Sequence, residues 1–556
     1  MCGIWAIFGS QEDVAKQCSS CMSIRHRGPD AFRIEDINHF KNCCFGFHRL
    51  AIRDDLNGMQ PLHFPNFEHY WLMYNGEIYN DHLLGKEFGF NFATVCDGEV
   101  IIHLYDKGGI EFVAKHLDGV FAFVLMDTRA RKVFVGRDTF GVRPAFRLHT
   151  PHNFLAVCSE AKGLISLCHK MSENESHVEP FPPGFVEEYE LDGIGDAILK
   201  RSFRFHDIGQ FPVYKTLVTT TDGDVHANVR NLLEAAVVKR LASDRRIGCM
   251  LSGGLDSSLV SALTAKHMKE SGHEYPLQTF SIGMKGSPDV VAAKKVADHI
   301  GSEHYEVSFT AEEGIEALND VIWHLESYDI TTIRASVGMY LISKYISTKT
   351  DTIVVLSGEG ADELAQGYIY FHQAPDASSA DQESRRLLKD LYMYDVLRGD
   401  RTTAANGLEI RVPFLDHQFT AYVLSLPSEM RQPREGTEKY LIRKAFDNTG
   451  LIPHEILWRP KEAFSDGIAS KEKSWFEILQ EHVESKVTDD EMNNASKKYP
   501  VNTPLTKEAY YYRQVFEKQY PRRSYWIPYY WMPKWTGATD PSARTLSHYR
   551  CSDVKS

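Results

Sequence analysis

The chain has 556 residues, a formal net charge of -13, 43% hydrophobic residues and 25% charged residues. This length exceeds what a single hydrophobic core usually organises, so we expect two large domains. The acidic balance and the lack of Lys/Arg clusters with interleaved aromatic residues argue against a protein that binds nucleic acid.

Neither the chain's apolar runs nor its cysteines indicate a membrane or a secreted protein. No apolar run approaches the length of a membrane span, and the sequence MCGIWAIFGSQED has no basic region before its short apolar stretch. Ten cysteines in so long a chain are not a disulfide framework, so we expect mostly buried, free thiols. Cys18 and Cys21 form a CxxC without a second pair at zinc spacing, which we interpret as structural. We expect a cytosolic protein.

The first third of the chain predicts a strand-rich domain. Short β-like runs such as CCFGFHRLAI and VFAFVLMD are separated by Gly, Pro and Asp turn signals up to about Leu167. One helix is expected over residues 97–106, where apolar residues recur at helical spacing. A polar stretch and a less regular segment follow, so we place this domain at residues 2–190 and a connecting segment at 191–224.

After residue 224 the pattern changes to alternating strands and helices. The runs IGCMLS, PLQTFSIGM and DTIVVLS are typical of strands buried on both faces of a parallel sheet. Ser287 with Pro288 predicts a helix start, and Thr310 with Glu313 predicts a capping box. We therefore predict an α/β domain with helices on both faces of the sheet over residues 225–535.

The C-terminal region contains the aromatic stretch RRSYWIPYYWMPKW. So many rings in water would be costly, so we expect this segment to dock on the rest of the protein. Residues 536–556 are predicted to form a tail, whose polar residues after Ser542 are expected to be disordered.

Cys2 is a candidate nucleophile. It follows only the initiator methionine, whose removal would leave a cysteine with a free α-amine. An α-amine titrates near pH ~8, so it can take the thiol proton without a histidine partner. Taken alone, a cysteine at position 2 is more often a chance occurrence, and the surrounding motifs decide between the two readings.

Five segments occur in one order: MCGIWAIFG, RHRGPD at residues 25–30, FGFHRLAI at 45–52, YNGEIYN at 74–80 and CDGEV at 96–100. Together they resemble class II glutamine amidotransferases, the N-terminal-nucleophile family. The resemblance implies an α+β domain in which two sheets lie between helical layers, an αββα sandwich. It also implies that Cys2 attacks the glutamine carboxamide while the Asn75 side chain and the Gly76 N–H form the oxyanion hole. Preorganised donors of this kind stabilise a tetrahedral oxyanion.

The same resemblance implies a binding site for free glutamine. Arg49 would pair with the α-carboxylate, while Glu77 and Asp97 would meet the ammonium group. Leu50 and Ile52 would complete the site. A surface salt bridge for Arg49 and a helix cap for Asp97 are the alternatives outside this motif context.

The segment SGGLDSS at residues 252–258 lies between a predicted strand and a predicted helix, where backbone N–H groups can hold a phosphate. It is neither a Walker A loop nor a dinucleotide fingerprint. It resembles the pyrophosphate loop (PP-loop) of ATP pyrophosphatases, which cleave ATP between its α and β phosphates. The resemblance implies ATP contacts from Ser252, Gly253, Gly254, Asp256 and Ser257.

The carboxylate of Asp256 in a phosphate loop indicates that Mg²⁺ stands between it and the phosphates. Asp362, in SGEGADE after the strand-like TIVVL, would lie at the same edge of a parallel sheet. We therefore predict these two carboxylates as magnesium ligands.

Together with SGEGADE, YDITTIRAS and RPKEAFSDG, the SGGLDSS loop resembles asparagine synthetases, over nearly the whole chain. The resemblance implies adenine contacts from Met250, Leu251 and Ile282, and completion of the nucleotide pocket by Ser357 and Gly358. It assigns Lys461 to the phosphates, Glu359 to the aspartyl adenylate, and an aspartate pocket to Thr331, Thr332 and Arg334. One departure is Ala361, where many relatives carry serine.

The resemblance implies the formation of asparagine from aspartate, glutamine and ATP, through an adenylate and ammonia carried by an internal tunnel. The expected partners are these small molecules, and a homodimer stays open. An amidotransferase that feeds a sugar phosphate should lack SGGLDSS, and a β-lactam-forming relative usually lacks the nucleophile. A catalytically dead scaffold would gain weight only if motif residues were missing, and none is missing among those named.

Overall fold

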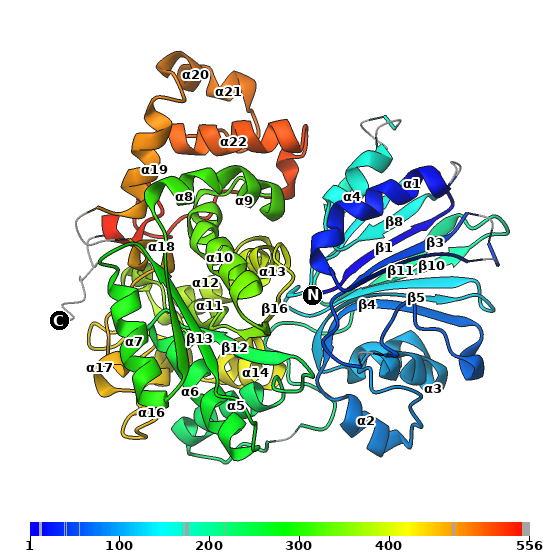
Figure 1. Ribbon diagram of the computed structural model, residues 1–556, viewed down its shortest axis with the longest axis horizontal. Coiled ribbons are helices and arrows are strands. Elements are labelled where there is room, and N and C mark those ends of the chain that lie inside the picture. The colour runs from blue at the N-terminus through cyan, green and yellow to red at the C-terminus, as the bar shows by residue number, and fades with distance from the viewer. Residues whose placement is uncertain are drawn as a thin grey trace. The chain divides into compact units, whose positions relative to one another are not determined.

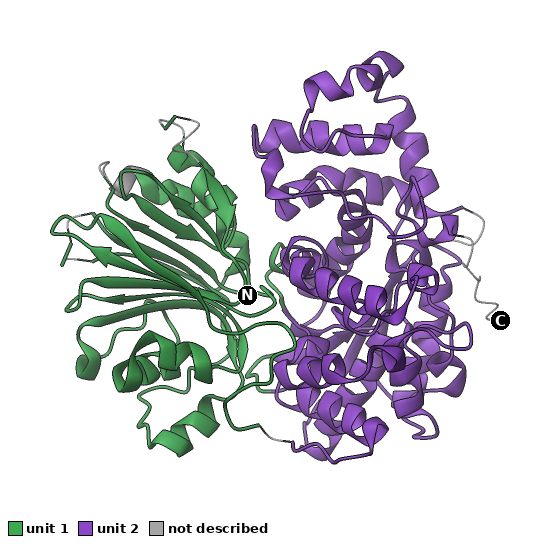
Figure 2. Ribbon diagram, turned by 180° about the vertical axis from the view of Figure 1, so that it is seen from behind, with its two compact units in different colours: residues 1–216, 242–245, 404–409 green, residues 217–241, 246–403, 410–556 purple. Residues whose placement is uncertain are grey.

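The protein is described by a computed structural model that covers residues 1–10, 14–37, 39–40, 42–54, 56–168, 171–172, 177–216, 218–469 and 473–546. The chain forms two compact units, which Figure 2 shows in two colours. The first comprises residues 1–216, 242–245 and 404–409, and the second comprises residues 217–241, 246–403 and 410–556. Among the described residues, no helix is both long and apolar enough to cross a bilayer.

The first unit contains two antiparallel sheets (Figure 1). One sheet has the order β2-β3-β1-β8-β7-β9, with strands β1 (Gly3–Phe8), β2 (Ala31–Asp36), β3 (Cys44–Arg49), β7 (Phe146–His149), β8 (Leu155–Cys158) and β9 (Val178–Pro180). The other has the order β11-β10-β6-β5-β4, with strands β4 (Tyr70–Ile78), β5 (Gly119–Asp127), β6 (Lys132–Arg137), β10 (Phe185–Leu191) and β11 (Ala197–Arg204).

Strand β5 shows why these sheets form a layered sandwich. Its side chains alternate between the two faces, as in any strand. Ala122 and Val124 belong to the core that includes β1 residues, whereas Phe121 and Phe123 belong to the core that includes helix α3 (Glu99–His116). Strand β5 is therefore buried on both faces.

Helices cover the outer faces of both sheets. Helices α1 (Val14–Cys21) and α4 (Lys162–Ile165) contact β3 and β8 of the first sheet. Helices α2 (Asp81–Phe88) and α3 contact each other, and α3 shares its core with the second sheet. The predicted αββα sandwich is confirmed, and the helix expected over residues 97–106 corresponds to the longer α3.

The segment predicted as a connection, residues 191–224, contains strand β11, which pairs antiparallel with β10. The prediction was wrong for this part of the segment. Most side chains of β11 are exposed, because it is the edge strand of its sheet. An exposed edge strand lacks the alternation of apolar and polar residues that reveals a half-buried strand.

The second unit is built on a sheet with the order β14-β13-β12-β15-β16. Its strands are β12 (Arg246–Met250), β13 (Gln278–Gly283), β14 (Glu303–Ser308), β15 (Thr352–Leu356) and β16 (Glu409–Arg411). The first four pair in parallel. Helices α6 (Leu255–Glu270) and α7 (Pro288–Ile300) connect strands on one side of β12, and α10 (Ile330–Lys349) precedes β15 on its other side.

Because parallel crossovers are right-handed, reversing the direction of strand order at β12 places α10 on the opposite face from α6 and α7. The predicted α/β domain with a parallel sheet and helices on both faces is confirmed. Such a reversal leaves a crevice at the carboxyl ends of the two strands involved, here β12 and β15.

Further helices surround this sheet. They are α5 (Val225–Val238), α8 (Ala311–Glu316), α9 (Leu318–Leu325), α11 (Ala361–Leu364), α12 (Ala377–Asp390), α13 (Asp395–Ala404), α14 (His417–Ser425), α15 (Ser428–Arg431), α16 (Tyr440–Phe446), α17 (His454–Leu457), α18 (Phe464–Gly467), α19 (Trp475–Glu484), α20 (Asp489–Asn493), α21 (Ala495–Lys498) and α22 (Lys507–Gln519).

Two predicted helix starts are confirmed. The Ser287 side chain accepts a hydrogen bond from the Val290 N–H, with Pro288 in the first turn of α7. Thr310 and Glu313 form both hydrogen bonds of a capping box at the start of α8. Each cap satisfies an N–H group that the helix itself leaves unpaired.

The aromatic segment near the C-terminus is docked, as predicted. Trp531 is 8% exposed and packs in a cluster with Tyr370, Phe371 and Tyr394. The backbone N–H of Trp531 donates to the Asp329 carboxylate at 2.7 Å. The predicted tail contributes Asp540, which accepts hydrogen bonds from Arg334 of α10, whereas residues 547–556 lie outside the described part of the chain.

Candidate functional sites

The first candidate site is a pocket in the first unit. The start of β1, the end of β3, strand β4 and the residues before α3 bring its lining together. Predicted residues in the lining are Cys2, Arg49, Leu50, Ile52, Gly76, Glu77 and Asp97. Asn75 lies beside them in β4 but does not line the pocket. Arg53, Gln60, Tyr74 and Glu409 also line it and were not predicted.

Cys2 is half-buried, with its Sγ 3.6 Å from the Leu50 carbonyl oxygen. Burial raises the pKa of its thiol. In the structure the α-amine belongs to Met1, which is buried, and burial lowers the pKa of this amine to about 6. An amine with a lowered pKa is neutral near pH 7, the form that accepts a proton.

Asn75 and Gly76 have the properties of an oxyanion-binding pair. The Asn75 side chain is 1% exposed, and neither its Oδ1 nor its Nδ2 has a hydrogen-bond partner among the described residues. A buried amide without a partner is costly, so such a group calls for a ligand. Gly76 has a φ of 152°, and an added Cβ would lie 2.0 Å from the Val120 carbonyl oxygen, so only glycine fits.

This pocket carries charges of both signs, from Arg49 and Arg53 and from Glu77, Asp97 and Glu409. Asp97 accepts hydrogen bonds from the Tyr74 hydroxyl at 2.8 Å and from the Ile78 N–H at 2.6 Å. Burial raises the pKa of Asp97, and the Arg53 guanidinium opposes that rise. Tyr74 is thus the residue that fixes Asp97, and it begins the motif YNGEIYN.

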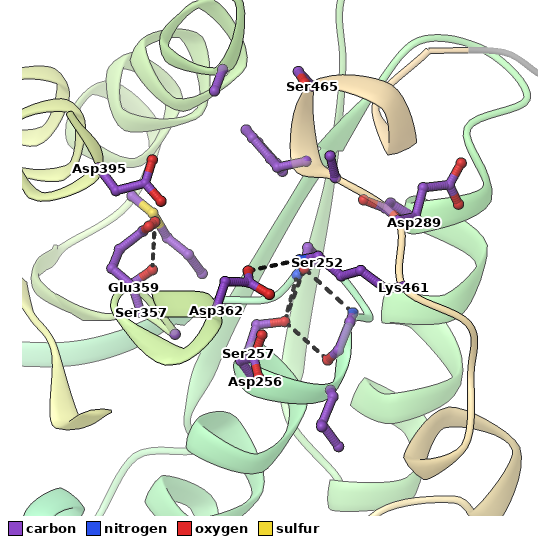
Figure 3. A pocket seen from close by; sticks show the side chains of 18 of the residues that line it. Ser252, Asp256, Ser257, Asp289, Ser357, Glu359, Asp362, Asp395, Lys461 and Ser465 are labelled. Carbon is purple, nitrogen blue, oxygen red and sulfur yellow. Dashed lines mark hydrogen bonds and ion pairs between the residues drawn. The ribbon is translucent and has the colours of Figure 1, made fainter. Parts of the chain in front are cut away.

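The second candidate site is a pocket at the carboxyl ends of β12 and β15 (Figure 3). Predicted residues in its lining are Met250, Leu251, Ser252, Gly254, Asp256, Ser257, Ile282, Thr331, Ser357, Gly358, Glu359, Asp362 and Lys461. The structure does not bring Gly253, Thr332 or Arg334 to the lining.

The loop between β12 and α6 is held by its own serines. The Ser252 N–H donates to Ser257 Oγ at 3.2 Å, and the Gly254 N–H donates to Ser252 Oγ at 3.3 Å. Gly253 has a φ of +73°, and a Cβ there would lie 2.4 Å from the Ala293 backbone nitrogen. Gly253 therefore allows the loop to pack closely on α7, which explains why it does not line the pocket.

Next to this loop, the carboxylates of two aspartates contact the ammonium groups of two lysines; the four residues are Asp256, Asp362, Lys439 and Lys461. Lys461 Nζ lies 2.7 Å from one oxygen of Asp362, and Lys439 Nζ lies 2.7 Å from the other. Lys439 also forms an ion pair with Asp256. Burial alone would raise the pKa of Asp362, but the two ammonium groups outweigh it and hold the pKa well below its usual range. Lys439 lies in no motif and was not predicted.

Glu359 is held by an arginine that the sequence did not reveal. Arg398 of α13 donates to Glu359 at 2.6 Å and contacts Asp395 at 3.1 Å. Burial raises the pKa of Glu359, and Arg398 limits the rise. The Ser357 hydroxyl donates to the same carboxylate at 3.3 Å. Figure 3 shows Glu359 and Asp395 in the same pocket as Asp362 and Lys461.

Of the three residues predicted for the aspartate pocket, the structure places Thr331 in the lining and the other two elsewhere. Thr331, Ala335 and Met339 line the pocket, as expected for residues spaced by four on one helical face. Thr332 instead bonds Asp329 through both its N–H and its hydroxyl. Arg334 lies on another face of α10 and pairs with Glu508 at 2.6 Å and Asp540 at 2.7 Å.

The predicted magnesium ligands are the carboxylates of Asp256 and Asp362, which both line the second pocket. Among the described residues, no group of three or more His, Cys, Asp or Glu side chains could hold a metal. Asp256 and Asp362 nevertheless fit Mg²⁺, which binds through one or two carboxylates and takes its other ligands from water and phosphate. Asp256 Oδ1 is buried and has no hydrogen-bond partner in the described structure.

Two family models and several curated relatives match this chain. The family model "Glutamine amidotransferase domain" matches residues 1–182, and the model "Asparagine synthase" matches residues 228–383 and 373–539. The chain is 60% identical over 557 aligned residues to the "Asparagine synthetase [glutamine-hydrolyzing]" of Gallus gallus and to that of Homo sapiens, with 99% of each chain covered. The chain belongs to the asparagine synthetase family.

Two solved structures, an amidotransferase and an NAD+ synthetase, are less similar to this chain. A glutamine phosphoribosylpyrophosphate amidotransferase from B. subtilis has a TM-score of 0.30 and 16% identity, and the match covers 55% of this chain and 81% of that chain. An NAD+ synthetase from Burkholderia pseudomallei has a TM-score of 0.19 and 11% identity, and the match covers 42% of this chain and 89% of that chain.

Arg334→Met should destabilise the second unit by about 3–5 kcal/mol, because it leaves Glu508 and Asp540 without their buried counter-ion. Urea unfolding of the second unit measures this loss. The matched control is Arg385→Met, which removes an exposed ion pair to Asp381 and should cost less than about 1 kcal/mol. Equal midpoints for the two variants would contradict a structural role for Arg334.

Proposed function

We propose that the protein is a glutamine-dependent asparagine synthetase. It converts L-aspartate, L-glutamine, ATP and water to L-asparagine, L-glutamate, AMP and diphosphate. The observation that carries the proposal is the presence of both pockets in one chain of this family, each lined by most of the residues that its chemistry requires.

At the first pocket, Cys2 Sγ attacks the carboxamide carbon of glutamine, and the thiol proton passes to the α-amine that removal of Met1 would give Cys2. Asn75 and the Gly76 N–H donate to the oxyanion. The C–N bond breaks, ammonia leaves, and water hydrolyses the thioester to give glutamate. Arg49 selects the substrate's α-carboxylate, while Glu77 and Asp97 select its ammonium group. Support comes from the unpartnered amide of Asn75 and the tight fit at Gly76.

At the second pocket, the side-chain carboxylate of aspartate attacks the α-phosphorus of ATP, and pyrophosphate leaves toward the loop at residues 252–258. Lys461 compensates the charge that develops on the phosphates. Ammonia from the first site then attacks the acyl carbon, and the C–O bond to AMP breaks. The raised pKa of Glu359, which burial causes, suits it to take a proton from the attacking ammonia.

Mg²⁺ would be held by Asp256 and Asp362 and would supply charge neutralisation for the departing pyrophosphate. Met250, Leu251 and Ile282 would contact the adenine, with Ser357 and Gly358 beside it. We retain Thr331 as the contact to aspartate and assign no substrate contact to Thr332 or Arg334.

We further propose that this reaction takes place in the cytosol and that the enzyme forms a homodimer. The cytosol is a reducing compartment, which suits a catalytic thiol and the nine cysteines that are free among the described residues. Analytical ultracentrifugation tests the assembly.

The test of the proposed function is product identification. Purified protein receives aspartate, glutamine, ATP and Mg²⁺, and the products are separated by chromatography. Asparagine, AMP and pyrophosphate are expected in equal amounts. ADP and phosphate in place of AMP and pyrophosphate would overturn the adenylate step, and a failure to form asparagine would overturn the function.

Cys2→Ala should abolish synthesis with glutamine, because it removes the nucleophile and leaves the second pocket unchanged. Ammonium salt should still support synthesis, best at mildly alkaline pH, where more free NH3 is present. Cys18→Ala is the control, since that thiol lies outside the pocket lining. Glutamine-dependent activity that survives in Cys2→Ala would refute the nucleophile.

Glu359→Ala should stop synthesis from either nitrogen donor, while glutamine hydrolysis by the first unit continues. The reason is that both donors share the adenylate and its capture by ammonia. Glutamate release and asparagine formation, measured in the same sample, separate the two activities. Ammonia-dependent synthesis at the normal rate in this variant would show that Glu359 has no part in the reaction.

A further inference from the structure

Lys439 occupies the centre of the second pocket's ionic cluster. Its side chain is only 2% exposed. The ammonium group forms an ion pair with Asp256 and lies 2.7 Å from Asp362 Oδ1. These are the two carboxylates that the proposed function assigns to Mg²⁺, so a lysine stands in the space between the expected metal ligands.

The surrounding chain is shaped to hold Lys439 there. An added Cβ on Gly367 would lie 2.0 Å from Lys439 Cε and 2.2 Å from Asp362 Oδ1, so residue 367 must be glycine for this arrangement. Lys439 itself has a φ of 54°, a left-handed conformation that costs energy in a residue other than glycine. Strained conformations of this kind persist where the surroundings enforce them, and they concentrate at functional sites.

The cluster is balanced in charge. Asp256 and Asp362 carry two negative charges, and Lys439 and Lys461 carry two positive charges.

The pocket lining contains further charged groups of both signs, which are Asp289, Glu359, Glu363, Asp395, Glu438 and Glu462, and Arg398, Arg443 and Arg459. The charges of the two expected metal ligands are themselves compensated by Lys439 and Lys461, which lie within ion-pair distance of them. To bind at these ligands, a free divalent cation would have to displace a buried ammonium group.

We infer that Lys439 is an internal counter-ion that keeps the two carboxylates closed to a free divalent cation and turns to phosphate oxygens when the metal arrives with a nucleotide. Lysine suits this task because it places a compact charge on a flexible stem. The inference rests on the proposed function only in taking Asp256 and Asp362 as the metal ligands.

This arrangement couples the metal to the nucleotide. When a triphosphate is present, the ammonium of Lys439 has new anionic partners, and the carboxylates become available to the cation. Coupling of this kind is reciprocal, so the nucleotide strengthens metal binding as much as the metal strengthens nucleotide binding. Metal binding without nucleotide should be weak in the unmodified protein and should become tight once Lys439 loses its charge.

The experiment titrates Mn²⁺, which shares the oxygen ligands of Mg²⁺ and has a paramagnetic resonance signal, into the full chain without nucleotide. Lys439→Met should bind Mn²⁺ at least about tenfold more tightly than the unmodified protein, because two carboxylates then face a single lysine. Lys439→Gln, whose amide can still donate to a carboxylate, should show the same gain and provides a second variant should Lys439→Met fail to fold.

Two controls locate the effect. Lys444→Met, on the same helix α16, removes a partly exposed ion pair to Asp447 and should leave Mn²⁺ affinity unchanged. Adding Asp362→Asn to Lys439→Met should abolish the gain. The inference is overturned if the unmodified protein binds Mn²⁺ as tightly as the folded Lys439 variants, or if the gain survives Asp362→Asn. Asparagine formation by the unmodified protein is measured separately, so a failure of the proposed function remains distinguishable.

Discussion

Strands β12 and β15 pair in parallel although two other strands and five helices separate them in the chain. This pairing brings the loop at residues 252–258 and the loop at residues 357–363 to the same edge of the sheet. The direction of strand order reverses at β12, which leaves room beyond the strand ends for a ligand. The cluster of Asp256 and Asp362 depends on this pairing, since these residues lie in the first turns of α6 and α11, directly after the two strands.

Burial then sets the chemistry in both units. In the first, it raises the pKa of Cys2 and of Asp97, and it leaves the amide of Asn75 without a partner. In the second unit, burial raises the pKa of Asp362, and the ammonium groups of Lys439 and Lys461 outweigh this effect and lower the pKa. Buried charges of this kind are tolerated only when paired, and both units contain such pairs, Arg53 with Asp81 in the first unit and the two lysines with Asp362 in the second.

The sequence predicted those parts of the fold that are specified by local patterns, such as apolar runs, glycine-rich turns and helix caps. The sequence predicted the β-like runs, the segments SGGLDSS and SGEGADE, and the helix caps at Ser287 and Thr310. Each of these features depends on residues that are close together in the sequence. Strand β11 was missed because an exposed edge strand has no apolar face. Arg334 pairs with Glu508 and Asp540 and does not line the pocket, because a motif gives a residue's position in the sequence and not the helix face on which it lies.

Lys439 and Arg398 were missed for a different reason. Lys439 meets Asp256 across 183 residues of sequence, and Arg398 meets Glu359 across 39. Neither lies in a motif with a recognisable pattern of residue types. Contacts made by folding at such distances leave no trace in a single sequence, so these two lining residues were found only in the structure.

The most direct measurement follows the oxygen atoms of aspartate. Aspartate labelled with ¹⁸O in its side-chain carboxylate is incubated with glutamine, ATP and Mg²⁺, and the nucleotide product is examined by mass spectrometry. An adenylate predicts AMP that carries one ¹⁸O atom, because the acyl C–O bond breaks when ammonia attacks. Unlabelled AMP, or label found in inorganic phosphate beside ADP, would contradict the account.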